Sequence, residues 1–457
     1  MKIVILGAGQ VGSSVAESLV SEQNDLTVVD IDTKRLRALQ DRLDLRTVTG
    51  SGSHPSVLVE AGIDDADLLI AVTQSDETNL VACRLAARMF NVPRRIARLR
   101  AADYLANEKV LGEDGFDVDL SICPEQILTD YIVKLVEFPE ALQVLDFAGG
   151  KVSLVAVRAF KGGPLVGRQL KDLRTQNPAL DARIVAIFRG DRSIVPEGHT
   201  VIEAGDEVFC LAASGHIREV MRELRRMDRP VRRVMIAGGG NIGMRLARAL
   251  EQNYSVRVIE HNARRCEILA ARLGKALVLT GDTTDEELLA DEGIADMDLF
   301  VAVTNDDENN IMSSLLAKRM GARRVVALIN RRSYVDLLQA GEVDIAISPA
   351  QATIGTLLAH VRRGDVVAVH SLRRGAAEAL EAVAHGDRES SRIVERRVEE
   401  IELPPGTAIG AVVRGEEVLM AHHDTQIRAG DHVIVFVMDK KTLPRVEKLF
   451  QVSAGFL

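Results

Sequence analysis

The sequence lacks an apolar run long enough to cross a bilayer, a framework of paired cysteines and an excess of basic residues. Its apolar runs, such as residues 433–438, have the length of strands and fall short of the roughly 20 residues of a membrane-spanning helix. The formal net charge of -9 argues against a dedicated nucleic-acid binder, which normally carries a basic surplus. We therefore expect a soluble globular protein that binds no nucleic acid and does not span a membrane.

The cysteines are few, far apart and without CxxC spacing, which fits reduced thiols in a reducing compartment. They are Cys83, Cys123, Cys210 and Cys266. Core filling is the favoured interpretation for all four. Because residues 1–6 already have the pattern of a first strand, we expect no secretory signal before the fold and a cytosolic location.

The sequence also lacks the patterns of common catalytic sites. It shows no Ser/His/Asp or Cys/His arrangement, no P-loop and no convincingly paired carboxylates. His422, His423 and Asp424 invite a metal hypothesis, but adjacent residues on a strand point to opposite faces, so we interpret them as surface residues. We predict a chain that binds rather than catalyses, with no metal site.

The sequence does contain a duplication. The dinucleotide-binding fingerprint G-x-G-x-x-G occurs at residues 7–12 and again at residues 238–243. The sequence offset between these two fingerprints also relates two further pairs of segments, 49–50 with 280–281 and 73–79 with 304–310. A chance motif match would not keep register over such a length, so one architecture occurs twice.

Each copy alternates strand-length apolar segments with helical patterns, which predicts a parallel sheet. The expected strands are 3–6, 26–29, 45–49 and 68–72 in the first copy, and 234–237, 256–259, 276–279 and 299–303 in the second. We predict an α/β protein with two Rossmann-like parallel-sheet domains.

A smaller module, expected to be α+β, follows each Rossmann-like unit. Its strands are expected near 152–157, 184–188 and 208–211 in the first module. The corresponding segments of the second module are 394–403, 418–421 and 433–437. The turn Gly205-Asp206 of the first module recurs as Gly430-Asp431 in the second. The predicted domains are 1–123, 143–228, 232–350 and 370–453, with the arginine-rich residues 222–233 as a linker.

The fingerprint glycines have distinct physical roles. Gly7 permits a tight turn, Gly9 lets the backbone approach a pyrophosphate, and Gly12 lets helix and strand pack closely, while the helix N-terminus supplies N–H donors. The corresponding glycines of the second copy are Gly238, Gly240 and Gly243. Both turns are therefore candidate phosphate sites.

An acidic residue ends the second strand of each copy, Asp30 in the first and Glu260 in the second. A carboxylate there accepts hydrogen bonds from ribose hydroxyls and disfavours a 2′-phosphate, which favours NAD or adenosine over NADP. Arg98 is a further candidate phosphate or ribose partner, and it aligns with Ala327 in the second copy. We therefore expect binding at the second site to be weaker or different.

Residues 73–77 and 304–308 lie where a strand ends and a helix begins. Ser75 or Asn305 is a candidate N-cap, and the acids that follow complement the helix dipole. Capping is the favoured explanation for the acids, whereas Thr73 and Thr304 are additional candidates to face the adenosine.

Together with segments 204–208, 312–320, 348–349 and 403–407, these motifs resemble the bacterial Trk potassium-uptake regulatory subunits of the tandem RCK (KTN) family, essentially end to end. The resemblance implies that each Rossmann unit is an RCK N-lobe and each small module an RCK C-lobe. It also implies a cytoplasmic protein, peripheral on the inner face of the cell inner membrane. Such a protein forms a homo-oligomeric ring beneath an integral-membrane potassium-translocating subunit of the TrkH/TrkG type.

The resemblance also implies binding roles for individual residues. For the first nucleotide site these are Gly7, Ala8, Gly9, Gln10, Val11, Asp30, Thr73, Gln74 and Arg98. For the second site they are Gly238, Gly239, Gly240, Asn241, Ile242 and Glu260. The implied ligand is NAD or NADH, with ATP or ADP open as alternatives and a C-lobe ligand undetermined. The copies also depart from each other at Ser51, where the second has Asp282.

The expected mechanism is conformational gating, in which a nucleotide favours one relative arrangement of the lobes. A tenfold differential affinity supplies roughly 1.4 kcal/mol per site. The apolar helices at 127–136 and 354–361 are candidates for lobe crossing or subunit contact, although core packing gives the same periodicity. Two alternatives are an NAD-dependent oxidoreductase, which needs a proton donor near the nicotinamide ring, and a free-standing cytosolic nucleotide sensor.

Overall fold

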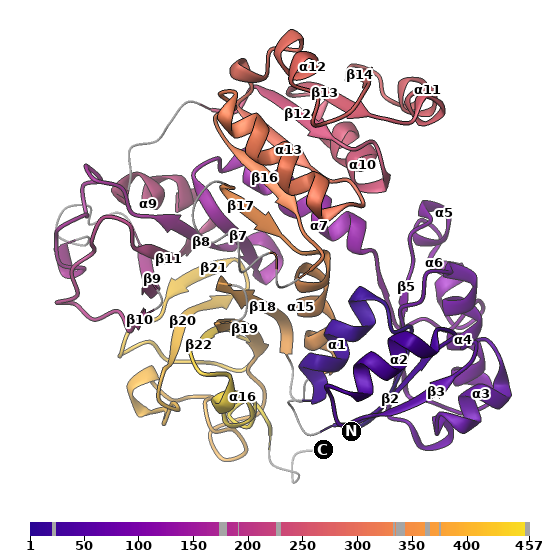
Figure 1. The fold of residues 1–457 in the computed structure, drawn as a ribbon. Helices are drawn as coiled ribbons and strands as arrows, with labels where there is room; N and C mark the ends of the chain where they lie inside the picture. The colour runs from indigo at the N-terminus through magenta and orange to yellow at the C-terminus, as the bar shows by residue number, and fades with distance from the viewer. Residues whose placement is uncertain are drawn as a thin grey trace.

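The computed structural model describes residues 1–20, 24–172, 181–190, 192–224, 230–331, 334, 343–361, 366–373 and 376–452. Two parallel and two antiparallel sheets alternate along this part of the chain (Figure 1). The predicted α/β class, with two Rossmann-like sheets each followed by a small α+β module, is confirmed. The expected domain ends at 228 and 453 and the linker residues 225–229 lie outside the described residues.

The first parallel sheet has the strand order β3-β2-β1-β4-β5-β6. Its strands are β1 (Lys2–Leu6), β2 (Asp25–Asp30), β3 (Arg46–Thr49), β4 (Leu68–Ala71), β5 (Arg94–Arg98) and β6 (Leu120–Ile122). Its helices are α1 (Gln10–Val20), α2 (Thr33–Gln40), α3 (Pro55–Glu60), α4 (Asp76–Arg88), α5 (Ala102–Leu105) and α6 (Glu108–Leu111). Every residue of β4 is buried, which explains its continuous apolar sequence.

The second parallel sheet repeats this order as β14-β13-β12-β15-β16-β17. Its strands are β12 (Arg233–Ala237), β13 (Ser255–Glu260), β14 (Leu277–Thr280), β15 (Leu299–Ala302), β16 (Val325–Leu328) and β17 (Ile345–Ile347). Its helices are α10 (Asn241–Leu250), α11 (Ala263–Arg272), α12 (Glu286–Asp291) and α13 (Asp307–Arg319). In both sheets the strand order reverses beside the first strand, where ligands bind in open α/β sheets.

The two small modules contain antiparallel sheets of order β10-β9-β11-β8-β7 and β18-β19-β22-β20-β21. The first comprises β7 (Ala141–Phe147), β8 (Val152–Arg158), β9 (Ala182–Arg189), β10 (Arg192–Ile194), β11 (Glu207–Ala213) and α9 (Ile217–Leu224). The second comprises β18 (Val366–Leu372), β19 (Ala377–Val383), β20 (Thr407–Arg414), β21 (Glu417–Met420), β22 (His432–Val437) and α16 (Leu443–Glu447).

The sequence interpretation of the second small module was partly wrong. Residues 394–403 form a loop with a short 3-10 helix, Val398–Glu400, and not a strand. The strand that corresponds to β8 is β19, since both pair with the strand that follows a Gly-Asp turn. Alternation is weak in β19, where Glu378 and Glu381 are buried, so its pattern was not recognised.

Two long helices exchange between the halves of the molecule. Helix α7 (Pro124–Glu137) follows the first parallel sheet, yet its buried side chains Leu128, Ile132 and Leu135 belong to the core of the second. Helix α15 (Pro349–Val361) follows the second sheet and packs against α1 of the first. Figure 1 shows α7 beside α10 and α15 beside α1. The lobe crossing expected of these two helices is therefore present within one chain.

The exchange depends on close packing. A Cβ added to Gly355 of α15 would lie 2.3 Å from the carbonyl oxygen of Val369, so only glycine lets this helix approach β18. Each large apolar side chain that α7 buries stabilises the arrangement by about 1.5–3 kcal/mol. The two parallel-sheet domains are thus held by each other's helices.

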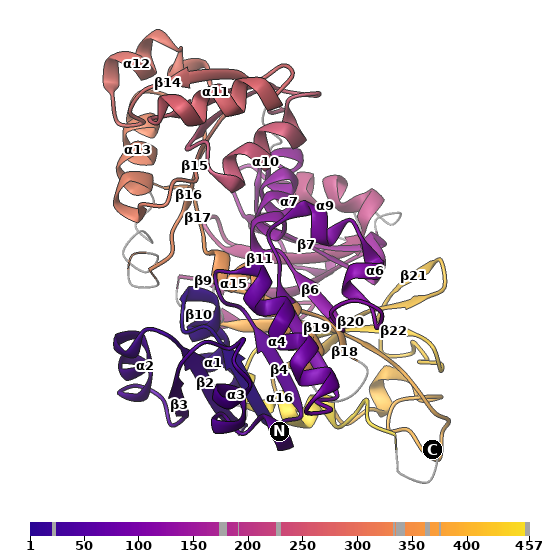
Figure 2. The ribbon, with the colours of Figure 1, turned by 90° about the vertical axis from the view of Figure 1, so that its right-hand side faces the viewer.

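The small modules also share a core. Phe147 and Phe209 of the first pack with Leu372 and Phe436 of the second, and Figure 2 shows the two antiparallel sheets adjoining. The backbone N–H of Ala148 donates across this interface to the buried carboxylate of Glu381 at 2.7 Å. Within the described ranges, no helix combines the length and apolar character required to traverse a bilayer.

Candidate nucleotide sites

The first glycine turn is tight and leaves the start of the following helix uncovered. Gly7 has φ +104°, a conformation that L side chains rarely adopt, and a Cβ on Gly12 would lie 1.8 Å from the carbonyl oxygen of Gly7. A Cβ on Gly9, in contrast, would meet no atom within 4 Å. Gly7 and Gly12 therefore form the turn, while Gly9 leaves the entrance to α1 open for a ligand.

The second turn repeats these features. Gly238 has φ +104°, and a Cβ on Gly243 would lie 1.9 Å from the carbonyl oxygen of Gly238. Gly240 faces open space and serves as the N-cap of α10 without any side-chain hydrogen bond, so the N-terminal N–H groups of the helix keep their capacity for an anion. The residues between the glycines are exposed at Gln10 and Asn241, half-buried at Ile242 and buried at Val11.

The position after the first glycine is closed in the second copy. A Cβ on Gly239 would lie 2.3 Å from Cδ1 of Leu269 and 3.2 Å from Oε2 of Glu260, whereas the first copy has Ala8 at this position. The side chain of Leu269 therefore occupies most of the space that the Ala8 methyl group fills in the first turn, and Glu260 borders it.

The acids that end β2 and β13 are fixed at the mouths of the turns. Asp30 Oδ2 accepts from the N–H of Ala8 at 2.5 Å, and Glu260 Oε2 accepts from the N–H of Gly239 at 2.9 Å. The second oxygen of each carboxylate accepts from the backbone N–H two residues on, at 2.8 and 2.9 Å. Each acid thus lies beside its glycine turn. If a nucleotide bound its phosphates at that turn, its ribose would lie next to the acid.

Thr73 and Thr304 lie after β4 and β15, on the same sheet edge as the turns. Each hydroxyl donates to an asparagine amide oxygen, Asn79 Oδ1 or Asn310 Oδ1, at 2.7 Å. These buried asparagines in turn donate to backbone carbonyls at the ends of β5 and β16. The threonines therefore fix the loop that borders each turn, and Gln74 extends from that loop as an exposed side chain.

The capping interpretation was correct in the first copy and off by one residue in the second. Ser75 Oγ accepts from the N–H of Thr78 and caps α4. In α13 the N-cap is Asp306, whose carboxylate accepts from the N–H of Asn309, and not Asn305. The register of the repeat already equates Ser75 with Asp306, whereas the sequence interpretation followed residue type.

Arg98 lies at the end of β5, and its guanidinium pairs with Glu125 at 2.9 Å, with Nε buried and unbonded among the described residues. Its counterpart is Leu328 and not Ala327, because Asn79 donates to the carbonyl of Arg98 and Asn310 to the carbonyl of Leu328. Strand pairing agrees, because β6 pairs with β5 at Arg98 and the equivalent strand β17 pairs with β16 at Leu328. The second copy lacks the arginine, as expected.

Two further differences distinguish the copies. Arg265, which the sequence interpretation missed, donates from Nε to the carbonyl of Gly239 at 2.9 Å and so supports the second turn. Asp282 accepts from the backbone N–H of Thr284, which lowers the pKa of its carboxyl group, where the first copy has the neutral Ser51. Alignment with Arg35 gives no signal of this contact, because Arg35 pairs with Asp32 in the first copy.

The cysteines lie in the core, as the sequence suggested. Burial raises the pKa of Cys83 and of Cys210 to about 12, so neither thiol is a nucleophile at neutral pH. In the part of the chain that the structure describes, no three His, Cys, Asp or Glu side chains are grouped for a metal ion.

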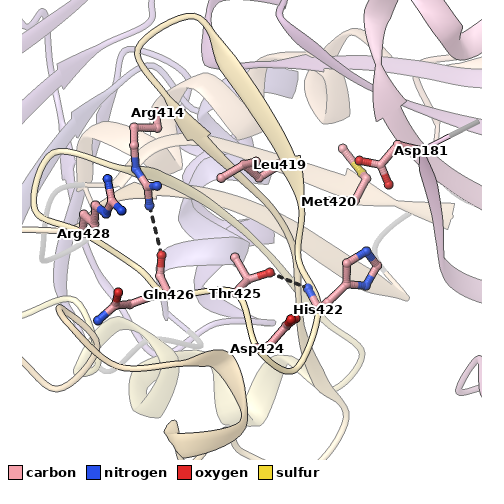
Figure 3. Close-up of a pocket in the computed structure, with 9 residues that line it drawn as sticks. All are labelled: Asp181, Arg414, Leu419, Met420, His422, Asp424, Thr425, Gln426 and Arg428. Carbon is pink, nitrogen blue, oxygen red and sulfur yellow. Dashed lines mark hydrogen bonds between the residues drawn. The ribbon is translucent and has the colours of Figure 1, made fainter. Parts of the chain in front are cut away.

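A pocket of about 360 Å³ lies at the second small module and is bordered by Asp181 of the first; its other lining residues are Arg414, Leu419, Met420, His422, Asp424, Thr425, Gln426 and Arg428. Figure 3 shows Arg414 and Arg428 at one end of it and the His422 ring at the other, so these side chains do not converge. Arg414 is already held by the buried carboxylate of Asp431 at 2.8 Å. The glycine turns match the chemistry of a nucleotide better than this pocket does.

Comparisons with known proteins agree with the paired architecture. The TrkA-N domain model matches residues 3–122 and 234–349, and the TrkA-C domain model matches residues 154–225 and 388–451. The chain belongs to the TrkA family. It is 58% identical to the Trk system potassium uptake protein TrkA of Halomonas elongata and 58% identical to that of Vibrio alginolyticus, over the full length of both partners in each comparison.

Solved structures show the same fold beyond the TrkA relatives. The RCK domain of GsuK superposes with a TM-score of 0.62 at 18% identity, covering 98% of this chain and 95% of that one. The GsuK channel bound to NAD gives the same TM-score and identity, covering 98% of this chain and 79% of that one. The parallel-sheet units and the small modules therefore share the fold of the GsuK RCK domain.

Proposed function

We propose that the chain is a cytoplasmic regulatory subunit that gates a membrane potassium-translocating subunit according to nucleotide occupancy at its two glycine turns. The observation that carries this proposal is the pair of open helix N-termini at Gly9 and Gly240, each with a carboxylate fixed beside it. Membership of the TrkA family gives the transport context. The GsuK channel, which has this fold, was solved with NAD bound, which supports NAD or NADH as a ligand, with ADP or ATP as alternatives.

The proposed contacts follow from position. Phosphates would meet the N–H groups of residues 7–12 and 238–243, and the ribose hydroxyls would meet Asp30 or Glu260. Thr73, Gln74 and Thr304 border the adenosine side, and Arg98 supplies a cation to the first site alone. The proposed N-lobes are residues 1–123 and 232–350, and the proposed C-lobes are residues 143–228 and 370–453.

The proposed mechanism uses the exchanged helices. Each parallel-sheet domain packs against a helix that leaves the other, so a nucleotide that reorients one domain also shifts α7 or α15 and the C-lobe beyond it. A nucleotide can shift this equilibrium only by its differential affinity for the two arrangements. Several sites in a homo-oligomeric ring on the inner face of the membrane, beneath a TrkH/TrkG-type partner, would add their contributions.

The proposal is tested by calorimetric titration of the full chain with NADH, NAD, ADP and ATP, followed by chemical analysis of the recovered nucleotide. Saturable binding with the nucleotide recovered unchanged is expected. Sustained consumption of NADH with added substrates would support an oxidoreductase instead. Binding without retention of the chain on membranes that contain the potassium transporter would support a free-standing sensor.

A further inference from the structure

Helix α10 connects the two nucleotide sites physically. Its N-terminus, at Asn241, receives the second glycine turn, and Arg245 lies one helical turn further, about 6 Å along the helix axis. The half-buried Arg245 side chain leaves its own domain and donates from Nη1 to Gln126 Oε1 at 2.9 Å and from Nη2 to the carbonyl of Arg100 at 2.8 Å. One guanidinium therefore bridges two segments of the other half of the molecule.

Both acceptors of Arg245 belong to the border of the first site. Gln126 follows Glu125, the ion-pair partner of Arg98. The N–H of Arg100 donates to Asp76 Oδ2 at 2.9 Å, and Asp76 begins α4 directly after the loop at 73–75. A movement of Arg245 would thus pull on the strand end that carries Arg98 and on the loop that carries Thr73.

The repeat does not carry this arginine at the equivalent position of its first copy. The register of the repeat equates Arg245 with Ser14 of α1, whose short hydroxyl side chain lacks the reach of a guanidinium. The second copy also has Leu328 in place of Arg98. Arg245 accordingly links α10, which follows the second glycine turn, to the border of the first site, and among the described residues Ser14 gives α1 no arginine at the equivalent position.

Buried packing makes the link stiff. Helix α7, which carries Gln126 in its first turn, packs along α10, and Leu128 and Ile132 share a core cluster with Leu246 and Leu250. The contact of Arg245 therefore lies at the end of a close-packed helix pair, so a small tilt of α10 is transmitted and not absorbed.

We infer that Arg245 is a positioning residue that couples the two nucleotide sites, so that occupancy of the second changes the affinity of the first. The inference rests on the proposed nucleotide binding at both turns. Allosteric couplings of this kind typically change affinity by about fivefold or more, and they require a contact that differs between the two states.

The experiment uses a fluorescent reporter in the full-length chain. The sequence contains no tryptophan, and Ile31 is 76% exposed directly after Asp30, so Ile31→Trp places a single tryptophan at the first site. ADP is the probe, because it is common to the candidate nucleotides. Its dissociation constant at the first site is measured in the reporter protein and with Glu260→Ala, Arg245→Ala and both substitutions added.

The expected result is that Glu260→Ala changes the first-site dissociation constant by about fivefold or more when Arg245 is present. In the Arg245→Ala background the same change should fall below about twofold. A change of equal size in both backgrounds overturns the inference, as does a factor near one in the reporter protein itself.

Two further variants separate coupling from stability. Arg248→Ala removes the same charge from the exposed side of α10, where Arg248 donates to the carbonyl of Arg272 at 3.4 Å, and it should keep the full coupling. Arg245→Lys keeps the charge and the aliphatic stem but not the two-pronged donor, and it should give an intermediate factor. Loss of coupling in Arg248→Ala, or full coupling in Arg245→Lys, contradicts the inference.

Failure of this inference differs from failure of the proposed function. If ADP, NADH, NAD and ATP all fail to bind the unsubstituted chain, the proposed function is wrong and the inference falls with it. If ADP binds both sites and the coupling is indifferent to Arg245, only the inference is wrong.

Discussion

The first and second glycine turns bend the backbone alike and differ in the charges around it. Gly7 and Gly238 share φ +104°, and the third glycine of each turn is equally close to its first. The first turn, however, has Arg98 on its border and a neutral Ser51, whereas the second has Leu328 and the ionised Asp282. The two copies thus share the shape of the glycine turn and differ in the charged side chains at these positions.

The largest expected effect comes from filling the tight glycine turn that the two copies share. Replacing Gly12 or Gly243 with valine would force a side chain onto the carbonyl oxygen of Gly7 or Gly238, and such overpacking costs about 3 kcal/mol. We expect each variant to lose that much stability in urea unfolding and to lose nucleotide binding at its own turn. If either variant unfolded like the parent chain, the two turns would not share the geometry described.

The acids distinguish the two sites more finely. Asp30→Ala and Glu260→Ala each remove an acceptor for ribose hydroxyls, and a hydrogen bond to a charged group contributes about 1.5–3 kcal/mol. We expect Asp30→Ala to weaken NADH binding more, because the first site also has Arg98. Calorimetric titration of both variants checks this ranking, and equal losses at the two positions would contradict it.

The arginine itself is the next test. Arg98→Leu gives the first site the residue of the second and should weaken ADP binding there by about tenfold, the effect of about 1.4 kcal/mol from one charge-assisted contact. Leu328→Met is the matched control, since it changes a buried side chain at the equivalent strand end without altering charge. An Arg98→Leu protein with unchanged ADP affinity would show that the Glu125 pair, and not the ligand, engages the guanidinium.

The smallest effect concerns the helix caps. Asp306→Ala should destabilise the chain by about 1 kcal/mol, because its carboxylate caps α13, while Asn305→Ala should change stability by less than about 0.5 kcal/mol. Thermal unfolding of the two variants checks the assignment. A larger loss from Asn305→Ala would favour the cap that the sequence suggested.

Most of the fold was predictable because the chain repeats itself. Buried parallel strands such as residues 68–71 give continuous apolar segments, and the glycine spacing gives the turns. Strand β19 was missed because Glu378 and Glu381 are buried within it. They pair with Lys440 and His432, which are distant from them in the sequence. A carboxylate satisfied by a distant partner cannot be distinguished from a surface carboxylate by sequence pattern.

The borders of the sites were less predictable than their centres. The periodicity of residues 127–136 shows an apolar helix face but not that the second sheet, and not the first, covers it. Arg245 contacts the first site only because of that exchange, so its contact with Arg100 has no local signal in the sequence. The counterpart of Arg98 was misplaced by one position because the second copy is one residue shorter than the first between the buried asparagine and this strand end, and the sequence interpretation shortened it by two.

The most direct test of nucleotide gating is potassium flux through the membrane subunit reconstituted in vesicles with the full-length chain. NADH and ADP are added in turn, and the nucleotide is recovered afterwards. We predict that flux changes with nucleotide in the parent chain, that the Asp30→Ala, Glu260→Ala double variant does not respond, and that the nucleotide is recovered intact. Flux that is the same with and without nucleotide, or a nucleotide response that survives loss of both acids, would contradict the gating role.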